Sequence, residues 1–546
     1  MKKRIDCILI GFHDERMQDM IERVKPLHGS SSSYLHYLAR SISHNGSRLK
    51  YSEAVNKSIE ISTGYKCDLN IYRMPNMALH YIRQFLHKFD YTVKLVNNFN
   101  DGKEDIKALL CEYEPSCIGI STTCQVDPIP IREVVDFVKQ YNNKCKIVIG
   151  GPYINSINFE YNTVQQDYIL ERMGGDFYIH ERQGQKAFYE ICQQLRMNEQ
   201  YQDFSKVNNI IYRQGKNFLR TRKVPENIDL NEDPIKDFTF YENFPMPSVY
   251  VQTALSCQLK CAFCRYPILS GTPTYMSIES LEKNFDYLYS LGVNTLIFVD
   301  DSFNIPIDRF KAILKLMIQK KYNFSWYSFF RISHADDECY DLMEQSGCRG
   351  VILGVESGSN TILKNMDKQV TAEQLAIGIK KLNEHGIMSH ASCMVGFPGE
   401  TVDTFKKTVE LLNQSKPTFY DIQIWYYENE VPIAKEKDYY KLVGYGYNWK
   451  HKDMDCHMAG KLVLEAIRSI NGSHFMPSLS FNMWSLGYYL TQGATVKEFL
   501  SFSKYFSQLV GYEHEYEQNE EILDKLMHVF ENNEALKDNL LSRQKS

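Results

Sequence analysis

The sequence predicts an α/β protein with three parts: a parallel sheet covered by helices, a partial barrel of six strand–helix units, and a mostly helical C-terminal region. Apolar strand segments alternate with amphipathic helical segments between residues 74 and 233, and a second such series begins near residue 248. Alternation of this kind is typical of parallel sheets. The strand pattern ends near residue 430. We therefore expect domains over residues 1–233, 234–430 and 431–546.

The composition indicates a soluble globular protein. Of 546 residues, 43% are hydrophobic and 24% are charged, and the net charge of -5 gives no reason to expect nucleic-acid binding. No stretch of 18 apolar residues exists, so we expect no membrane span. The short apolar run after Arg4 is broken by residues 11–15, which favours a first strand over 4–11 rather than a signal peptide. We expect a cytoplasmic protein.

The first strand–helix series predicts where a ligand binds. We expect an irregular polar stretch over 12–70, and then strands over 91–96, 117–123 and 146–152 with helices over 77–86, 106–110 and 131–138. Ligands of parallel sheets bind at the carboxyl ends of the strands. Thr122, Thr123, Gly150 and Gly151 lie at two such ends, and the glycines permit close approach of a bulky ligand. An ordinary tight turn explains the two glycines equally well.

The second series follows a proline-containing linker over 225–247. Its strands are expected over 248–255, 295–301, 324–331, 350–358, 388–399 and 420–425. Six units in about 180 residues are too few for a closed barrel of eight units, so a partial (β/α)6 barrel fits. Beyond it we expect helices over 453–472 and 495–545, separated by an apolar aromatic stretch over 481–490.

Three cysteines, Cys257, Cys261 and Cys264, lie within eight residues, directly after the first strand of the second series. Cysteine thiolates hold iron–sulfur clusters, and three ligands leave one iron of a four-iron cluster open to a distant cysteine or a small molecule. Zinc is the alternative, but the second CxxC pair typical of structural zinc sites is absent. The other eleven cysteines are scattered, which favours buried small side chains over a disulfide framework.

Other polar side chains follow the strands of the second series and should converge on the cysteine loop. Asp300 and Asp301 could bind an ammonium group, Glu356 could accept hydrogen bonds from ribose hydroxyls, and Arg331 could bind a carboxylate through two hydrogen bonds. Gly396 begins a turn that offers backbone to a flat ring. Each alone has an explanation as a helix cap or salt bridge, but together they could hold an amino acid joined to a nucleoside.

These motifs resemble the radical S-adenosylmethionine (SAM) superfamily over residues 250–425. The CxxxCxxC loop is the superfamily signature, and Phe263 supplies the usual aromatic residue before its last cysteine. The segment 298–303 resembles the acidic strand-end motif of the cobalamin-dependent branch, and segments 354–359 and 396–401 match two further motifs. The resemblance implies a [4Fe-4S] cluster on the three cysteines, with SAM chelating the fourth iron and cleaved to a 5′-deoxyadenosyl radical. The implied SAM-binding residues are Phe263, Asp300, Asp301, Arg331, Glu356 and Gly396.

The N-terminal sheet resembles the Rossmann-like cobalamin-binding domain of that branch. The likeness is carried by segments 6–12, 122–138 and 147–153, and it implies that Thr122, Thr123, Gly150 and Gly151 contact cobalamin. The chain looks most like the branch that includes the phosphinate-methylating enzymes of phosphinothricin-type antibiotic biosynthesis. It lacks the Asp-x-His-x-x-Gly motif, and His13 does not have that spacing, so we do not expect histidine ligation of cobalt. His180 and Arg182 stand where an acidic Gly-Glu-Gly turn is common, so this segment departs from the pattern of the branch.

The resemblance implies cobalamin-dependent methylation of an unactivated carbon or a phosphinate in natural-product biosynthesis. The implied substrate is a small molecule or a peptide, and the implied electron donor is a flavodoxin or ferredoxin. The aromatic residues Trp425, Tyr426 and Tyr427 could line the substrate pocket or belong to the core. Two alternatives stay open: a cobalamin-binding radical SAM enzyme that catalyses a rearrangement, epimerisation or cyclisation, and a non-catalytic metal-binding protein.

Overall fold

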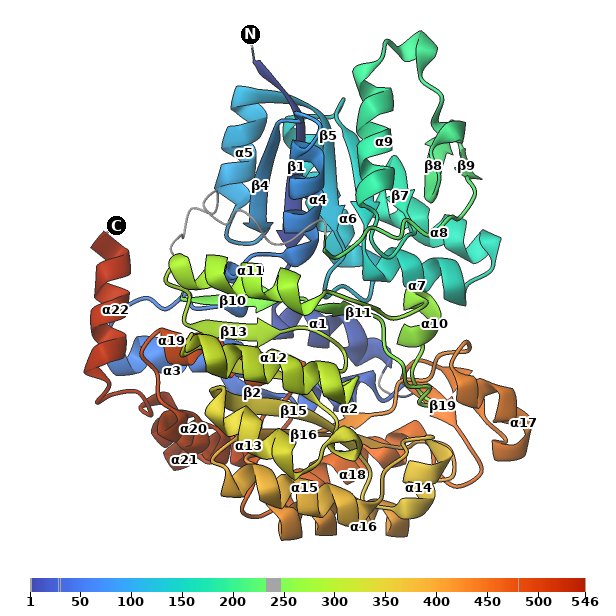
Figure 1. The fold of residues 1–546 in the computed structure, drawn as a ribbon. Coiled ribbons are helices and arrows are strands. Elements are labelled where there is room, and N and C mark those ends of the chain that lie inside the picture. The colour runs from blue at the N-terminus through green and yellow to red at the C-terminus, as the bar shows by residue number, and fades with distance from the viewer. Residues whose placement is uncertain (1, 28, 30, 232–246, 480, 546) are drawn as a thin grey trace. The chain divides into compact units, whose positions relative to one another are not determined.

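The computed structural model describes residues 2–27, 29, 31–231, 247–479 and 481–545 (Figure 1). The chain forms two compact units. We call the first the sheet unit (Met1–Glu15 and Tyr72–Pro245) and the second the barrel unit (Arg16–Ile71 and Met246–Ser546). Most of the expected linker, residues 232–246, lies outside the described residues.

The sheet unit contains a seven-stranded sheet in the order β4-β1-β5-β6-β7-β8-β9. Strands β4 (Val93–Asn98), β1 (Lys3–Phe12), β5 (Tyr113–Ser121), β6 (Lys146–Gly150) and β7 (Phe177–Ile179) are parallel. Strands β8 (Ile210–Gln214) and β9 (Asn217–Arg220) continue the sheet in antiparallel pairs. The expected parallel α/β sheet is therefore present.

Alternate residues of the central strands face two separate cores. Ile8 and Ile10 pack with Val134 of α6 (Pro128–Tyr141), in a core that α5 (Lys103–Glu112) and α8 (Thr163–Met173) complete. Cys7 and Leu9 belong instead to a core shared with α4 (Met77–His87) and α9 (Gln185–Arg196). Because both faces are covered, the strands are nearly continuous apolar runs. This leaves the carboxyl edge of the sheet as the place for polar groups.

The barrel unit is built on seven parallel strands in the order β10-β13-β14-β15-β16-β17-β20. The strands are β10 (Ser248–Val251), β13 (Thr295–Phe298), β14 (Ser325–Phe330), β15 (Cys348–Glu356), β16 (Met388–Val395), β17 (Phe419–Ile424) and β20 (His474–Phe475). The first six are the strands of the expected partial barrel. The seventh, β20, has only two residues and was not predicted.

Helices follow the strands of the barrel unit in turn. They are α11 (Ile278–Ser290), α12 (Ile307–Lys320), α13 (Asp337–Gln345), α14 (Asn360–Asn365), α15 (Ala372–Glu384), α16 (Val402–Ser415) and α18 (Cys456–Ser469). The C-terminal region is helical as expected, with α19 (Met483–Thr491), α20 (Val496–Leu509), α21 (Glu520–Met527) and α22 (Glu534–Lys545). The helical stretch expected over 495–545 is divided into α20, α21 and α22, and Gly511 with φ +82° lies in the turn after α20.

The segment Arg16–Ile71 differs most from expectation. We expected an irregular stretch within the first domain, but it folds into α1 (Met17–Val24), α2 (Ser33–Leu38), a hairpin of β2 (Ser41–His44) and β3 (Ser47–Lys50), and α3 (Tyr51–Thr63). It belongs to the barrel unit. Tyr51 packs against Phe481, Phe502 and Phe506, and its hydroxyl lies 2.6 Å from that of Ser503.

Candidate active site

The cysteine loop follows β10 at the carboxyl end of the barrel strands. Cys261 is buried and packs with Leu259 and Ile305, and the half-buried Cys257 and Cys264 pack against the same apolar cluster. Among the described residues, no three metal-ligating side chains already surround a common metal position. The three thiols are neighbours in one apolar cluster.

The electrostatics of this pocket favour a cation among the thiols. Burial, together with the adjacent Cys261, Cys257 and Asp301, raises the pKa of Cys264 to about 11. A bound metal replaces the thiol protons and relieves this repulsion. Arg331 directs Nη1 at the Cys261 sulfur, 3.4 Å away, and the Ser302 hydroxyl lies 3.3 Å from the Cys257 sulfur. The donor set therefore fits an iron–sulfur cluster.

Backbone hydrogen bonds hold the cysteine loop from two sides. The Ala262 N–H donates to the Met366 carbonyl at 2.8 Å, and the Ala262 carbonyl accepts from the Ile433 N–H at 2.9 Å. The Cys264 N–H donates to the Cys261 carbonyl at 3.0 Å, closing a tight turn. The loop conformation is therefore set by residues about 100 and 170 positions later in the chain, which its own sequence does not reveal.

The two aspartates after β13 have different environments. Asp300 is fully buried and accepts hydrogen bonds from the backbone N–H groups of Thr253 (2.7 Å) and Ala254 (3.0 Å) and from the Thr253 hydroxyl. Its carboxylate therefore braces the segment that leads into the cysteine loop. Asp301 is exposed by surface area, but surrounding protein and the neighbouring Asp300 raise its pKa to about 6.

Glu356 and Lys368 form an ion pair beside the cysteine loop. The Lys368 Nζ lies 2.7 Å from the Glu356 Oε1, and both side chains are almost fully buried. A Cβ atom at Gly354 would lie 2.7 Å from each of these two atoms, so only glycine leaves them room. Glu356 has φ +62° and sits at a register irregularity between β15 and β16. Its carboxylate is thus already paired.

Lys368 also touches two other predicted site residues. Its carbonyl accepts a hydrogen bond from the Arg331 Nη2, and its Nζ lies 5.5 Å from the centre of the Phe263 ring. Sequence reasoning missed Lys368, because nothing in the segment around it marks a lysine that meets Glu356. The structure therefore brings Phe263, Arg331 and Glu356 together around one lysine, and Arg331 also contacts Cys261.

Gly396 has a local structural reason to be glycine. It has φ +94°, and a Cβ atom there would lie 2.2 Å from the Trp449 ring. Its N–H donates to the Glu400 Oε2 at 2.6 Å, and the Glu400 Oε1 has no hydrogen-bond partner within the described part of the chain. Burial raises the pKa of Glu400 to about 8. Glu400 is therefore a largely neutral acid that fixes this turn, a role that sequence reasoning also missed.

In the sheet unit, the four predicted cobalamin-contacting residues lie together at the carboxyl ends of β5 and β6. The Thr122 N–H donates to the Gly150 carbonyl at 2.8 Å, and the Thr123 hydroxyl lies 2.8 Å from that of Ser121. A Cβ atom at Gly151 would lie 2.7 Å from the Thr122 hydroxyl, and the φ of Gly151 is +118°. Packing against Thr122 therefore already explains the glycine at 151.

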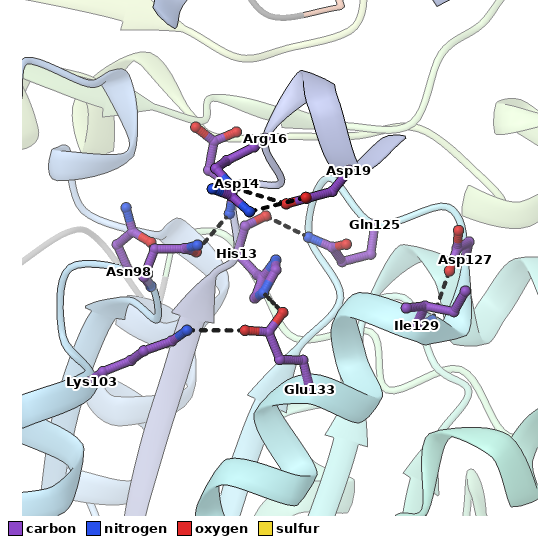
Figure 2. Close-up of polar contacts among 11 residues, drawn as sticks. His13, Asp14, Arg16, Asp19, Asn98, Lys103, Gln125, Asp127, Ile129 and Glu133 are labelled. Atoms are coloured by element: carbon purple, nitrogen blue, oxygen red, sulfur yellow. Dashed lines mark hydrogen bonds and ion pairs between the residues drawn. The ribbon is translucent and has the colours of Figure 1, made fainter. Parts of the chain in front are cut away.

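Figure 2 shows a further polar network at this edge, centred on His13 after β1. The His13 Nε2 lies 3.0 Å from the Glu133 Oε2, and Lys103 Nζ lies 3.0 Å from the other oxygen of that carboxylate. The His13 carbonyl accepts a hydrogen bond from Gln125 at 2.8 Å, and the His13 ring stacks on Phe99. The Nε2 atom of His13 is thus already paired with the Glu133 carboxylate.

Comparison with known proteins finds a radical SAM domain within the barrel unit. Residues 251–412 match the model of the radical SAM superfamily. A protein of Pyrococcus horikoshii, described as an uncharacterized methyltransferase, is 22% identical over 62% of this chain and 72% of its own length. The ribosomal protein uS12 methylthiotransferase RimO of Pseudothermotoga lettingae is 31% identical over an aligned stretch. That stretch covers 31% of this chain and 41% of the length of RimO.

Two solved structures resemble more of the chain. The radical SAM methyltransferase TsrM of Kitasatospora setae, with cobalamin and a [4Fe-4S] cluster bound, superposes with a TM-score of 0.54 over 66% of this chain and 74% of its own, at 18% identity. The cobalamin-dependent radical SAM enzyme OxsB superposes with a TM-score of 0.55 over 87% of this chain and 78% of its own, at 15% sequence identity. The chain thus contains a radical SAM domain and shares the fold of these two enzymes.

Proposed function

We propose that this protein is a cobalamin-dependent radical SAM methyltransferase. The observation that carries the proposal is the loop of three thiols at the carboxyl end of the first barrel strand, with the Arg331 guanidinium directed at one of them. The fold shared with TsrM and OxsB and the methyltransferase description of the Pyrococcus relative support the same activity.

Cys257, Cys261 and Cys264 would hold a [4Fe-4S] cluster, and the edge formed by Thr122, Thr123, Gly150 and Gly151 would hold cobalamin. When bound, these groups supply the electron that cleaves SAM and the methyl group that is transferred. The remaining work of the chain is to bind, to orient and to exclude water.

Several side chains near the cysteine loop are suited to these tasks. Arg331 places a positively charged guanidinium beside the Cys261 sulfur, at 3.4 Å. Asp301 is better placed than Asp300 to accept a hydrogen bond from the SAM amino group, because Asp300 already accepts three hydrogen bonds from the protein. Lys368 holds the Glu356 carboxylate in position for a ribose hydroxyl.

The turn from Gly396 to Glu400 presents backbone to a flat ring, and the carboxyl of Glu400 fixes its shape. Phe263 of the cysteine loop contributes an aromatic face, with the Phe397 ring centre 6.4 Å away. We assign these residues to the adenine side of the SAM site.

The substrate we propose is a small molecule or a peptide, and the electron donor is a flavodoxin or ferredoxin. All fourteen cysteines are free, as in proteins of the reducing cytoplasm. The described helices are too short or too polar to cross a bilayer. The reaction we propose is methyl transfer to an unactivated carbon or a phosphinate in natural-product biosynthesis.

Anaerobic reconstitution with iron, sulfide and hydroxocobalamin tests this function. We expect the protein to retain cobalamin through gel filtration and to form 5′-deoxyadenosine or S-adenosylhomocysteine from SAM when dithionite is added. Cys261→Ala should abolish SAM cleavage and leave cobalamin retention intact, whereas Cys111→Ala, which changes an exposed cysteine of the sheet unit, should alter neither. Folded protein that retains no cobalamin would contradict the methyltransferase assignment.

A further inference from the structure

The inner face of β16 and β17 carries polar side chains that have no place in the SAM site proposed above. The two strands pair in parallel, with Ser392 opposite Asp421. Tyr420 points outward, because its hydroxyl donates to a carbonyl of α18 at 3.4 Å. Successive side chains of a strand point to opposite faces of the sheet. Asp421 and Gln423 of β17, and Ser392 of β16, therefore face the interior of the barrel.

Part of this inner face is accessible. Ala391 and Cys393, which point outward from β16, are fully buried, whereas Ser392 and Met394 are only half-buried. Gln423, which lies opposite Met394 in the register of the two strands, is half-buried as well. These three inward side chains therefore keep surface that other protein atoms do not cover.

Two of them present polar groups that are ready to bind a ligand. The Gln423 Nε2 donates to the Asp421 Oδ2 at 3.1 Å. Because a carboxylate only accepts hydrogen bonds, this contact fixes the amide and leaves its oxygen, Oε1, as a free acceptor. The Ser392 hydroxyl makes no hydrogen bond within the described part of the chain. An acceptor and a hydroxyl on adjacent strands match the N–H and C=O groups of an amide.

The carboxylate behind Gln423 is already neutralised. Arg40, which follows α2, places Nη2 3.1 Å from the Asp421 Oδ1, and the same nitrogen donates to the Ile422 carbonyl at 2.6 Å. Both charged side chains are buried. Asp421 also accepts the Ser478 N–H at 3.1 Å. This ion pair therefore orients Gln423 and offers no unpaired charge to a ligand.

The other charged or titratable groups at this face are also accounted for. Lys368 is paired with Glu356, as described above. Burial lowers the pKa of His390 to about 4, so this inward side chain of β16 is uncharged at neutral pH. Arg331 is the residue expected to bind the SAM carboxylate. An anionic substrate would therefore lose its hydration here without gaining an unpaired cation.

We propose that the substrate binds to this inner face through an uncharged amide, with Ser392 and Gln423 as its hydrogen-bond partners. Met394, half-buried beside them, adds an apolar contact. The inference rests on the proposed function and narrows its substrate class. The methylated group is then a carbon of an amide-containing small molecule or peptide, and a phosphinate is disfavoured because it is an anion.

Saturation-transfer NMR on the reconstituted, SAM-loaded full-length protein tests the proposal with three probes. N-acetyl-leucinamide carries two uncharged amides, N-acetyl-leucine replaces one of them with a carboxylate, and dimethylphosphinate is a small anion. We expect the amide to bind about tenfold more tightly than the carboxylate and the phosphinate not to compete with it. Ser392→Ala with Gln423→Met should weaken amide binding by about tenfold, the usual effect of losing two hydrogen bonds. SAM binding, measured by equilibrium dialysis, should be unchanged.

Ser328→Ala with Gln319→Met is the matched control. Ser328 is a buried serine of β14 on the same side as Phe330, which packs against Phe310 of α12, and Gln319 is exposed on α12. An equal loss in this control, an amide that does not bind, or an anion that binds as tightly would overturn the amide site. Protein that shows the expected amide binding but cleaves no SAM on reduction would count against the proposed function and leave the amide site standing.

Discussion

Individual buried acidic side chains near the cysteine loop have different structural roles. Asp300, Glu356 and Glu400 are all acids at strand ends, and the sequence alone assigns the first two similar roles. The structure separates them: Asp300 braces backbone, Glu356 is paired with a lysine, and Glu400 has one hydrogen bond and a raised pKa. The cysteines could be predicted because their spacing is local, whereas Lys368 and Glu400 depend on contacts made only after folding.

Glu400 predicts a pH dependence of stability. Its pKa is about 8 in the folded protein against a usual 4.5, so between these values the unfolded chain has lost a proton that the folded chain retains. Stability therefore falls as pH rises from about 4.5 to 8. We expect Glu400→Gln to raise the melting temperature relative to wild type more at pH 8 than at pH 5. The exposed Glu410→Gln serves as control, and a difference that does not grow with pH would contradict the account.

The Lys368–Glu356 ion pair predicts that substitutions at these two positions have strongly non-additive effects on the free energy of unfolding. Lys368→Met leaves the Glu356 carboxylate buried without its partner, which typically costs about 3–5 kcal/mol of unfolding free energy. Adding Glu356→Gln removes that charge, so the double variant should recover much of the loss. Denaturant unfolding of the two single variants and the double variant measures the coupling, and purely additive losses would rule out the pair as the cause.

At the scale of elements, helices and strands with a clear local pattern were predictable. Very short elements, and segments that depend on contacts with distant parts of the chain, were not. The strands of both sheets are apolar runs between turn residues, a local signal that marks them in the sequence. Strand β20, with two residues, is too short to carry such a signal. The segment Arg16–Ile71 failed for a different reason, because α3 buries Tyr51 against aromatic residues some 430 to 455 positions later.

This arrangement predicts that a residue near the N-terminus stabilises the barrel unit. All four tryptophans, Trp326, Trp425, Trp449 and Trp484, belong to that unit, so their fluorescence reports its unfolding. Tyr51→Ala should lower the unfolding free energy measured by tryptophan fluorescence by about 3–5 kcal/mol, the usual cost of removing a buried aromatic ring.

The control changes a buried ring of the sheet unit. Phe188→Ala removes a buried aromatic side chain of α9, which packs in the sheet-unit core that contains Cys7 and Leu9. It should leave the tryptophan transition in place. If Phe188→Ala shifts that transition and Tyr51→Ala does not, the division of the chain into these units is wrong.

At the scale of the whole molecule, both sheets follow the same rule. Each is parallel where its predicted ligand contacts lie, and each gathers polar residues and glycines at the carboxyl ends of its strands. The fold class was predictable because two series of alternating strands and helices are compatible with few folds other than two parallel sheets covered by helices. The assignment of Arg16–Ile71 was not, because the chain leaves the sheet unit after Glu15 and returns at Tyr72.

The central claim is that Cys257, Cys261 and Cys264 hold a [4Fe-4S] cluster whose open iron binds SAM. Electron paramagnetic resonance of the reconstituted, dithionite-reduced protein tests it most directly. We predict the signal of a reduced four-iron cluster that changes when SAM is added, and that acquires nitrogen-15 coupling when the SAM amino group carries that isotope. A cluster signal unaffected by SAM, or one that persists when all three cysteines are replaced by alanine, would contradict the account.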